Sequence, residues 1–222
     1  MRLKVCGMRD TDNIRDLLSL QPDYMGIIFY DKSPRNAEGI IEEKVIKDFP
    51  ESTRKVGVFV NASFDFIMDK VNRFGLDMLQ LHGEEPVELV KELKAEGIKV
   101  IKVFGVDDDF DFAVLKPYKN EVDFFLFDTK SKQRGGTGVQ FNWNKLEEYD
   151  QEVPFFLSGG ISNESIKSLG QLKGLNIHAI DVNSKYELEP GLKNIEELKR
   201  LTTSLRGTKQ SLDTEDRHGG KN

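Results

Sequence analysis

Short apolar runs alternate along most of the chain with stretches in which apolar residues recur at helical spacing. The apolar runs have the length of strands, and they lie at residues 3–6, 24–30, 55–60, 76–81, 99–104, 122–128, 153–157 and 177–182. A helix is expected after each run. Three of the helices begin at the candidate N-caps Asp10 or Thr11, Ser63 and Ser162. The other five lie near residues 38–48, 86–96, 110–115, 144–148 and 194–203. The pattern therefore predicts a strand followed by a helix, repeated eight times.

Strands that alternate with helices pair in parallel through right-handed crossovers. We therefore expect a single (β/α)₈ TIM barrel as the catalytic domain, over residues 1–206. A doubly wound open sheet is the main alternative, but it often carries a GxGxxG turn after its first strand, which this chain lacks. Residues 207–222 contain one large apolar side chain, Leu212, and are expected to form a disordered, flexible polar tail.

Composition narrows the functional class. The 222 residues carry a formal net charge of −6, which argues against general nucleic-acid binding. A single cysteine excludes an internal disulfide, and the three histidines show no metal-ligand spacing. The N-terminus shows no basic-then-apolar leader, and no apolar run is long enough to cross a membrane. We therefore expect a cytoplasmic protein without a metal or cofactor, and with neither nucleic acid nor membrane as its partner.

The candidate chemistry lies at strand ends, because active sites of barrels form at the C-terminal ends of the strands. Cys6 ends the first strand just before Gly7, and Asp128 ends the sixth. Side chains alternate along a strand, so if Leu3 and Val5 face the helices, Cys6 points into the mouth of the barrel. A thiol and a carboxyl on nearly opposite walls form a candidate base and acid pair for one small ligand.

Both residues also have a purely structural interpretation. A lone cysteine is most often a small buried hydrophobic residue, and Asp128 could cap the loop that follows it or form an ion pair there. The apolar residues before Asp128 favour a desolvated carboxyl, and burial raises a carboxyl pKa toward the range that a general acid needs. A free cysteine has a pKa of about 8.5, so a catalytic Cys6 requires a site that favours the thiolate.

Other strand ends carry groups suited to binding. Gly159 and Gly160 could let backbone N–H groups approach a phosphate, although two glycines also make an ordinary turn. Arg35 could fork onto a carboxylate, and is otherwise a solvated loop arginine. Gly136 lies in a glycine-rich loop that suits a lid or backbone donors, and His82 is more typical of a group that orients a loop than of a catalyst.

Eight stretches, taken together, resemble the phosphoribosylanthranilate isomerase family of (β/α)₈ enzymes. They lie in the family order at residues 4–8, 29–35, 56–61, 79–83, 127–128, 135–138, 158–161 and 181–184. Eight collinear motifs are far more specific than any one of them. The resemblance implies a small-molecule substrate, N-(5-phosphoribosyl)anthranilate, and its Amadori rearrangement to 1-(2-carboxyphenylamino)-1-deoxyribulose 5-phosphate in tryptophan biosynthesis.

The resemblance also implies roles for single residues. Asp128 matches the general acid that protonates the ring oxygen and opens the ribose, and Cys6 matches the general base that removes the C2′ proton. Arg35 matches the residue that holds the anthranilate end. Further substrate contacts are expected at Asp181, Gln80 and His82, and the phosphate site is expected at Gly136, Gly159, Gly160, Asn183 and Ser184.

The loop after the last strand departs from the family pattern. Residues 184–187 read Ser-Lys-Tyr-Glu, whereas the family commonly has Ser-Gly-Val-Glu. A lysine does not adopt the conformations reserved for glycine. Either the loop keeps a backbone geometry open to any residue, with Lys185 adding a charge, or the phosphate affinity differs.

Other functions stay open at this point. One alternative is a related phosphosugar barrel, such as an indole-glycerol-phosphate synthase or a pentose-phosphate epimerase, although the scattered histidines do not suit the metal site of the epimerase. Another is a non-catalytic or differently specific phosphosugar-binding barrel. We expect a monomer, with a homodimer as the alternative.

Overall fold

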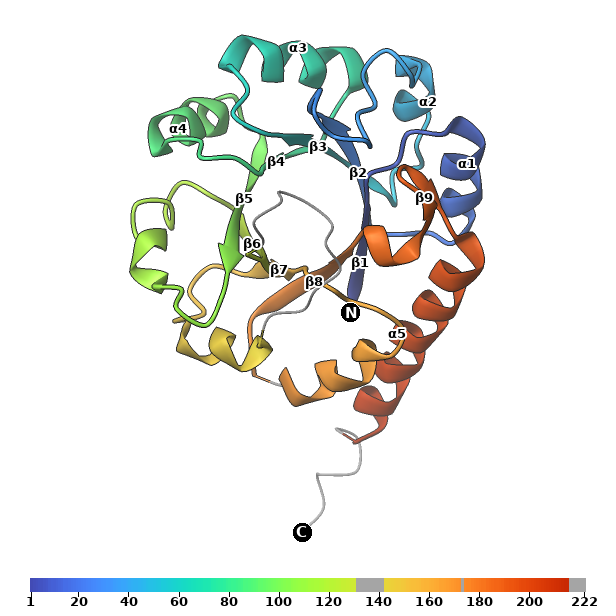
Figure 1. Ribbon diagram of the computed structural model, residues 1–222, viewed down its shortest axis with the longest axis vertical. Coiled ribbons are helices and arrows are strands. Elements are labelled where there is room, and N and C mark those ends of the chain that lie inside the picture. Colours follow the sequence, from blue (N-terminus) through green and yellow to red (C-terminus); the bar gives the residue numbers. More distant parts are fainter. Residues whose placement is uncertain (131–141, 173, 216–222) are drawn as a thin grey trace.

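The predicted strands pair in parallel in sequence order, and β1 pairs with β8 to close the ring (Figure 1). This computed structural model describes residues 1–130, 142–172 and 174–215, without the side chains of 167–169, 171 and 207–215. The barrel strands are β1 (Arg2–Cys6), β2 (Tyr24–Phe29), β3 (Arg54–Phe59), β4 (Met78–Leu81), β5 (Lys99–Val106), β6 (Phe124–Thr129), β7 (Phe155–Leu157) and β8 (Ile177–Val182). The predicted (β/α)₈ barrel is therefore confirmed.

Local capping fixes where two of the helices begin. Asp10 accepts a hydrogen bond from the N–H of Asn13 at 2.8 Å, and Ser63 accepts one from the N–H of Phe66 at 3.3 Å. Gly75, with a φ of 61°, ends α3 in the left-handed conformation. The helices are α1 (Thr11–Ser19), α2 (Glu43–Lys47), α3 (Phe64–Phe74), α4 (Val87–Ala95) and α5 (Ile195–Glu215), with 3₁₀ segments η1 (Phe112–Leu115), η2 (Trp143–Glu148), η3 (Ser165–Leu172) and η4 (Ser184–Tyr186). None of the described helices is long and apolar enough to cross a membrane.

Several helices differ from the prediction in length or type. The helix expected near residues 38–48 begins only at Glu43, because the chain before it continues along β2. The N–H of Ala37 donates to the carbonyl of Ile28 at 2.9 Å, and Gly39 has a left-handed φ of 72°. The segments that follow β5, β6 and β7 are 3₁₀ rather than α-helical.

The C-terminal helix is longer than predicted. It continues to Glu215, past the expected end near residue 203, and lies beside α1 (Figure 1). Its inner face carries Leu198, Leu201 and Leu205, which are all buried. The predicted tail boundary at residue 206 thus falls inside a helix, and residues 216–222 lie outside the described residues. The flexibility of the tail stays a prediction.

A small hairpin, which the sequence did not predict, follows β8. Its antiparallel strands are β9 (Glu187–Glu189) and β10 (Leu192–Lys193), and Lys193 pairs with Glu187. Gly191, between the strands, has a φ of 89°, a left-handed conformation that glycine adopts without strain. The hairpin places two charged residues of the last loop next to each other.

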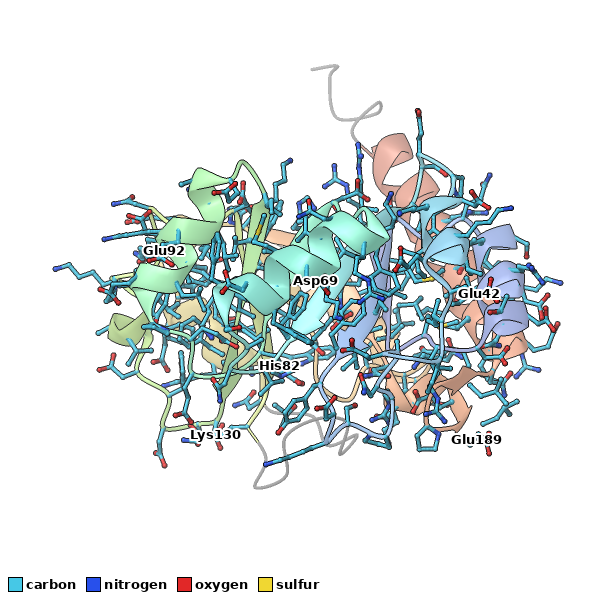
Figure 2. The ribbon with its side chains drawn as sticks, turned by 90° about the horizontal axis from the view of Figure 1, so that it is seen from above. Glu42, Asp69, His82, Glu92, Lys130 and Glu189 are labelled. Carbon is cyan, nitrogen blue, oxygen red and sulfur yellow. The ribbon has the colours of Figure 1, made fainter. Side chains whose placement is uncertain are left out.

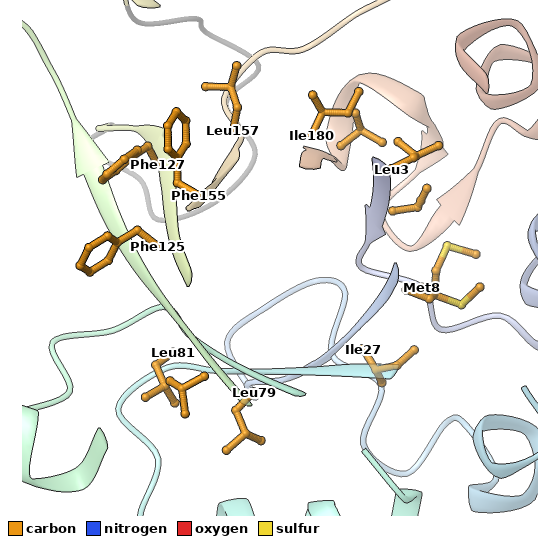
Figure 3. Close-up of a cluster of buried hydrophobic side chains, with 14 of the residues drawn as sticks. Leu3, Met8, Ile27, Leu79, Leu81, Phe125, Phe127, Phe155, Leu157 and Ile180 are labelled. Atoms are coloured by element: carbon orange, nitrogen blue, oxygen red, sulfur yellow. The ribbon is translucent and has the colours of Figure 1, made fainter. Parts of the chain in front are cut away.

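The strands sort their side chains by parity. Outward residues such as Leu3, Ile27, Phe125 and Ile180 surround the ring and form the main apolar core under the helices (Figure 3). Inward residues form a second apolar cluster, made of Tyr24, Val56, Met78, Ile101, Val103, Leu126, Phe156 and Ala179. Further along the same inward faces lie three buried polar side chains, Lys4, Gln80 and Asp181. The barrel interior therefore turns from apolar to polar toward the C-terminal ends of the strands.

A buried ion pair holds the loop after β4. The ammonium of Lys102 donates to Glu85 at 3.0 Å and to the carbonyl of Gly83 at 2.8 Å. Glu85 in turn accepts from the N–H groups of Asn61 and Gly83 at 2.9 Å each. Both charged side chains are at most 3% exposed. Because His82 lies within this loop, the pair fixes the backbone that carries it.

We expect Lys102→Met to lower the free energy of unfolding by about 3–5 kcal/mol, because it leaves the Glu85 carboxylate buried without a cation. Urea unfolding followed by circular dichroism measures this change. The double variant Lys102→Met/Glu85→Gln should recover part of the loss, since no charge then remains unpaired. A loss of less than about 1 kcal/mol in the single variant would show that the pair behaves like an exposed one.

Candidate active site

The polar end of the barrel opens into a cavity of about 190 Å³. In the view of Figure 2, His82 and Lys130, which follow β4 and β6, lie toward the same edge of the molecule as Glu189 of β9. Of the residues predicted from the sequence, the cavity is lined by Cys6, Arg35, Gln80, His82, Asp128, Gly159, Gly160, Asp181, Asn183 and Ser184. Gly136, the remaining one, lies outside the described residues. One cavity thus brings together all the described candidates.

Cys6 faces this cavity, as strand parity predicts. It packs with Ile28 and Val58 and is 4% exposed. Gly26 pairs with Cys6 on the neighbouring strand, and a Cβ at Gly26 would lie 2.6 Å from the sulfur, so the glycine makes room for the thiol. Burial raises the pKa of the Cys6 thiol, and the nearby Lys4 ammonium only partly opposes this. The protein groups around Cys6 therefore do not by themselves supply the stabilised thiolate that a catalytic Cys6 requires.

Lys4 and Asp181 form an ion pair at the floor of the cavity. The Lys4 ammonium donates to Oδ1 of Asp181 at 2.7 Å, and both side chains are buried. The two residues are register partners on β1 and β8, so the closure of the barrel itself brings them together. Burial raises the pKa of Asp181, and Lys4 opposes that change.

Asp128 lies on the other wall, near the end of β6, with its side chain 21% exposed. The pKa of Asp128 is raised to about 6, mainly by burial. The N–H of Thr129 donates to Oδ1 of Asp128 at 2.8 Å and lowers this pKa, whereas the negative charge of Asp181 raises it. The imidazole of His82 approaches Asp128, with 3.9 Å between Nε2 and Oδ2. Asp128 is therefore half-protonated near pH 6, and a carboxyl with such a pKa suits proton donation near neutral pH.

The loop after β7 comes close to Asp128 because it carries glycines. Gly159 and Gly160 have φ values of 88° and 68°, both left-handed. A Cβ at Gly159 would lie 2.3 Å from Oγ1 of Thr129 and 3.2 Å from Oδ1 of Asp128. Any larger residue would therefore push this loop away from the end of β6.

Gln80 reaches the cavity from β4 and is 1% exposed. Its amide nitrogen lies 3.3 Å from Nδ1 of His82. Its oxygen is buried, and no group in the described part of the chain donates to it. A buried acceptor without a donor suits a ligand hydroxyl or a bound water.

Arg35 forms a forked ion pair with a protein carboxylate. Its Nε donates to both carboxylate oxygens of Glu187, at 2.9 and 3.1 Å, and its Nη2 donates to Oε2 at 2.6 Å. The Arg35 side chain is 11% exposed, so it is not the solvated arginine of the structural interpretation. Part of its guanidinium is thus engaged before any ligand binds.

Sequence reasoning missed Glu187 and Lys193, which do not line the cavity themselves but hold the cavity residues Arg35 and Asn183. The ammonium of Lys193 donates to Glu187 at 2.6 Å and to the side chain of Asn183 at 2.6 Å. Although burial acts to raise it, the pKa of Glu187 is lowered by Arg35 and Lys193, so its carboxylate is charged. Charged residues in a loop usually face solvent, and the sequence carried no signal that the hairpin buries these two.

The loop with Lys185 resolves one alternative left by the sequence. Lys185 belongs to the 3₁₀ turn η4 and is not among the described residues with a positive φ. The loop therefore keeps a backbone geometry open to any residue. Lys185 lines the cavity from its exposed rim, together with Lys32, and adds positive charge there.

The arrangement provides a carboxyl that can give a proton and a thiol that can accept one as thiolate, on two walls of one cavity. Lys32, Arg35 and Lys185 line the cavity with positive charge, and the glycines after β7 line one side. Among the described residues, no group of three or more His, Cys, Asp or Glu side chains is placed to hold a metal ion. The geometry suits acid–base chemistry on a small anionic ligand.

Comparison with known proteins agrees with this description. A family model described as N-(5′-phosphoribosyl)anthranilate (PRA) isomerase matches residues 3–204. The N-(5′-phosphoribosyl)anthranilate isomerase of Parabacteroides distasonis is 42% identical over 206 residues, which cover 92% of this chain and 93% of that protein.

Solved structures show the same likeness. The phosphoribosyl anthranilate isomerase from Thermotoga maritima matches with a TM-score of 0.84 and 32% identity, over 93% of this chain and 99% of that one. A phosphoribosyl anthranilate isomerase in complex with reduced 1-(o-carboxyphenylamino)-1-deoxyribulose 5-phosphate matches with a TM-score of 0.80 and 30% identity, over 93% and 99%. Monomers generated from the dimeric enzyme of Thermotoga maritima match with a TM-score of 0.79 and 29% identity, over the same shares. The chain belongs to the N-(5′-phosphoribosyl)anthranilate isomerase family.

Proposed function

We propose that the chain isomerises N-(5-phosphoribosyl)anthranilate to 1-(2-carboxyphenylamino)-1-deoxyribulose 5-phosphate, with Asp128 as the general acid and Cys6 as the general base. The observation that carries this proposal is that the two groups line one cavity in a chain of this family. They come from β1 and β6, three strands apart around the ring, so they address a bound ribose from two sides.

Asp128 starts the reaction by giving its proton to the ring oxygen of the ribose. The bond between C1′ and the ring oxygen breaks, the anthranilate nitrogen supplies its electron pair, and an iminium forms. With a pKa of about 6, roughly a tenth of Asp128 is protonated at pH 7, which is enough to act as an acid. The ring opening leaves Asp128 as a carboxylate beside a new cation.

Cys6 then removes the proton from C2′ of the iminium, which gives an enolamine. A proton is then added at C1′ and the proton on the C2′ oxygen is lost, which converts the enolamine to the ketone. The four proton transfers cancel, so the reaction has no net uptake or release of protons. Burial raises the pKa of the thiol in the empty site, and the iminium lowers it again once formed, since a nearby positive charge favours the thiolate. Each proton transfer contributes roughly 10²–10⁴-fold to the rate.

The remaining candidates bind the substrate. The free edge of the Arg35 guanidinium takes the anthranilate carboxylate. Asp181, Gln80 and His82 lie between the acid and the base walls and take the sugar hydroxyls. The phosphate is placed on the loops after β7 and β8 and the glycine-rich loop, with contacts from Gly136, Gly159, Gly160, Asn183 and Ser184.

The reaction in this form uses no metal or cofactor, and the partner is a small molecule rather than a nucleic acid or a membrane. We place the protein in the cytoplasm, where tryptophan biosynthesis supplies the substrate. We propose a monomer, with a homodimer as the alternative, because a relative that is dimeric has also been obtained as monomers.

The first test is the loss of fluorescence of freshly prepared phosphoribosylanthranilate in EDTA. We expect the wild type to accelerate this loss, and Cys6→Ala and Asp128→Asn to lower kcat at least about 100-fold. Calorimetry with the reduced product analogue should show its affinity changed by less than about threefold in both variants, because the binding contacts remain.

Three results would count against this proposal. Absence of acceleration at micromolar wild type, with the analogue still bound, would favour a non-catalytic phosphosugar-binding barrel. Full activity of either variant would reject its assigned role. Loss of activity in EDTA would show that a metal takes part.

The second test uses the pH dependence of stability. The pKa of Asp128 is about 6 in the folded protein and near 3.9 in the unfolded chain, so the folded protein binds this proton more tightly. The contribution of Asp128 to the free energy of unfolding therefore falls as the pH rises through 6. We expect Asp128→Asn to be more stable than wild type by about 1–3 kcal/mol at pH 8, with a smaller difference at pH 4.

Thermal unfolding across this pH range measures the effect. Cys6→Ala is the matched control: burial raises the pKa of the Cys6 thiol, so the effect of this variant should not vary across the range in which Asp128 titrates. If Asp128→Asn gained the same stability at pH 4 and at pH 8, burial would not raise the pKa of the Asp128 carboxyl.

A further inference from the structure

Lys193 is a buried cation that the proposed chemistry does not use. Its side chain is fully buried, and its ammonium forms an ion pair with Glu187. Its backbone is anchored to α1, because its N–H donates to Oδ1 of Asn13 at 2.7 Å and its carbonyl accepts from Nδ2 of Asn13 at 2.9 Å. The ammonium is therefore held at a fixed point under the last loop.

This ammonium joins two parts of the substrate site. On one side it donates to Oδ1 of Asn183 at 2.6 Å, in the loop after β8 where the phosphate is placed. On the other it donates to Oε1 of Glu187 at 2.6 Å, and Glu187 holds the guanidinium of Arg35. A lysine ammonium has three donors around one charge, so it can serve both acceptors at once.

The fork between Arg35 and Glu187 leaves part of the guanidinium for a ligand. An arginine has five donors, and Glu187 takes the Nε edge and one hydrogen of Nη2. Within the described part of the chain no group accepts a hydrogen bond from Nη1, and the fork fixes the direction of this group. Gly7 allows this packing, because a Cβ there would lie 2.8 Å from both Cδ of Arg35 and Oδ1 of Asn183.

We propose that Lys193 is a positioning residue that ties the two ends of the substrate site together. Through Asn183 it fixes the phosphate end, and through Glu187 and Arg35 it fixes the end that holds the anthranilate carboxylate. This inference rests on the proposed function for the identity of the two ends. It predicts that one distant substitution disturbs both ends, while a substitution of Glu187 disturbs only one.

The test compares two ligands that share a phosphate but differ in the carboxylate. Ribose 5-phosphate reports the phosphate end alone, and the reduced product analogue reports both ends. We expect Lys193→Met to lower the affinity for ribose 5-phosphate at least threefold and the affinity for the analogue at least tenfold. We expect it also to lower kcat/KM about 100-fold, because the substrate is misplaced. Glu187→Gln should lower the affinity for the analogue to a similar degree and leave the affinity for ribose 5-phosphate within twofold of the wild-type value.

Lys70→Met is the matched control. Lys70 is likewise buried and ion-paired, but its partners Glu38 and Asp69 do not line the cavity, whereas Lys193 contacts the cavity residue Asn183. We expect it to lower the melting temperature while both affinities and kcat/KM stay within twofold of wild type. A purely structural role of Lys193 would give the same result as Lys70→Met.

The outcomes separate this inference from the proposed function. A wild type that neither turns over the substrate nor binds the analogue would reject the function, whatever Lys193 does. An active wild type whose Lys193→Met variant keeps both affinities would overturn the positioning role. Should Lys193→Met not fold, Lys193→Gln takes its place under the same criteria, and failure of both to fold would also overturn the proposal in favour of a structural role.

Discussion

Burial of charge at one end of an apolar barrel is the constraint on which this site depends. Moving an ion into a protein interior costs several kcal/mol, so each buried charge needs a partner in good geometry. Lys4 pairs with Asp181 where β1 and β8 close the barrel, and Lys193 pairs with Glu187 across the hairpin after β8. These pairs fix strand ends and loops that would otherwise be free, and the cavity takes its shape from them.

The same desolvation has opposite consequences for the two groups proposed to transfer protons. It raises the pKa of Asp128 to about 6, which favours the protonated form that an acid needs. It also raises the pKa of Cys6, which disfavours the thiolate that a base needs. In the proposed reaction, the raised pKa of Asp128 therefore favours the first proton transfer, whereas the raised pKa of Cys6 disfavours the second. The iminium cation formed by the first transfer would lower the thiol pKa, so the proposed order of the two steps agrees with the electrostatics.

Most of the fold and much of the site could be predicted from the sequence, because both follow from local periodicity. Alternation along β1 and β6 placed Cys6 and Asp128 in one cavity, and the strand-then-helix repeat gave the closed barrel. The hairpin β9–β10 could not be predicted, since its strands are only three and two residues long and one carries charges at both ends. The burial of Lys193 depends on Asn13, far away in the chain, and local sequence does not encode such a contact.

Arg35 shows why a residue type alone does not determine its contacts. The sequence indicated a fork onto a carboxylate, and the structure has that fork, but with Glu187 rather than with a ligand. A guanidinium held in this way gives up part of its donors, and gains a fixed plane for the rest. Less side-chain freedom then has to be lost when a carboxylate binds. Among the described residues, no carboxylate holds the exposed rim lysines Lys32 and Lys185 in this way. Their positive charge would attract an anionic ligand toward the cavity without fixing its orientation.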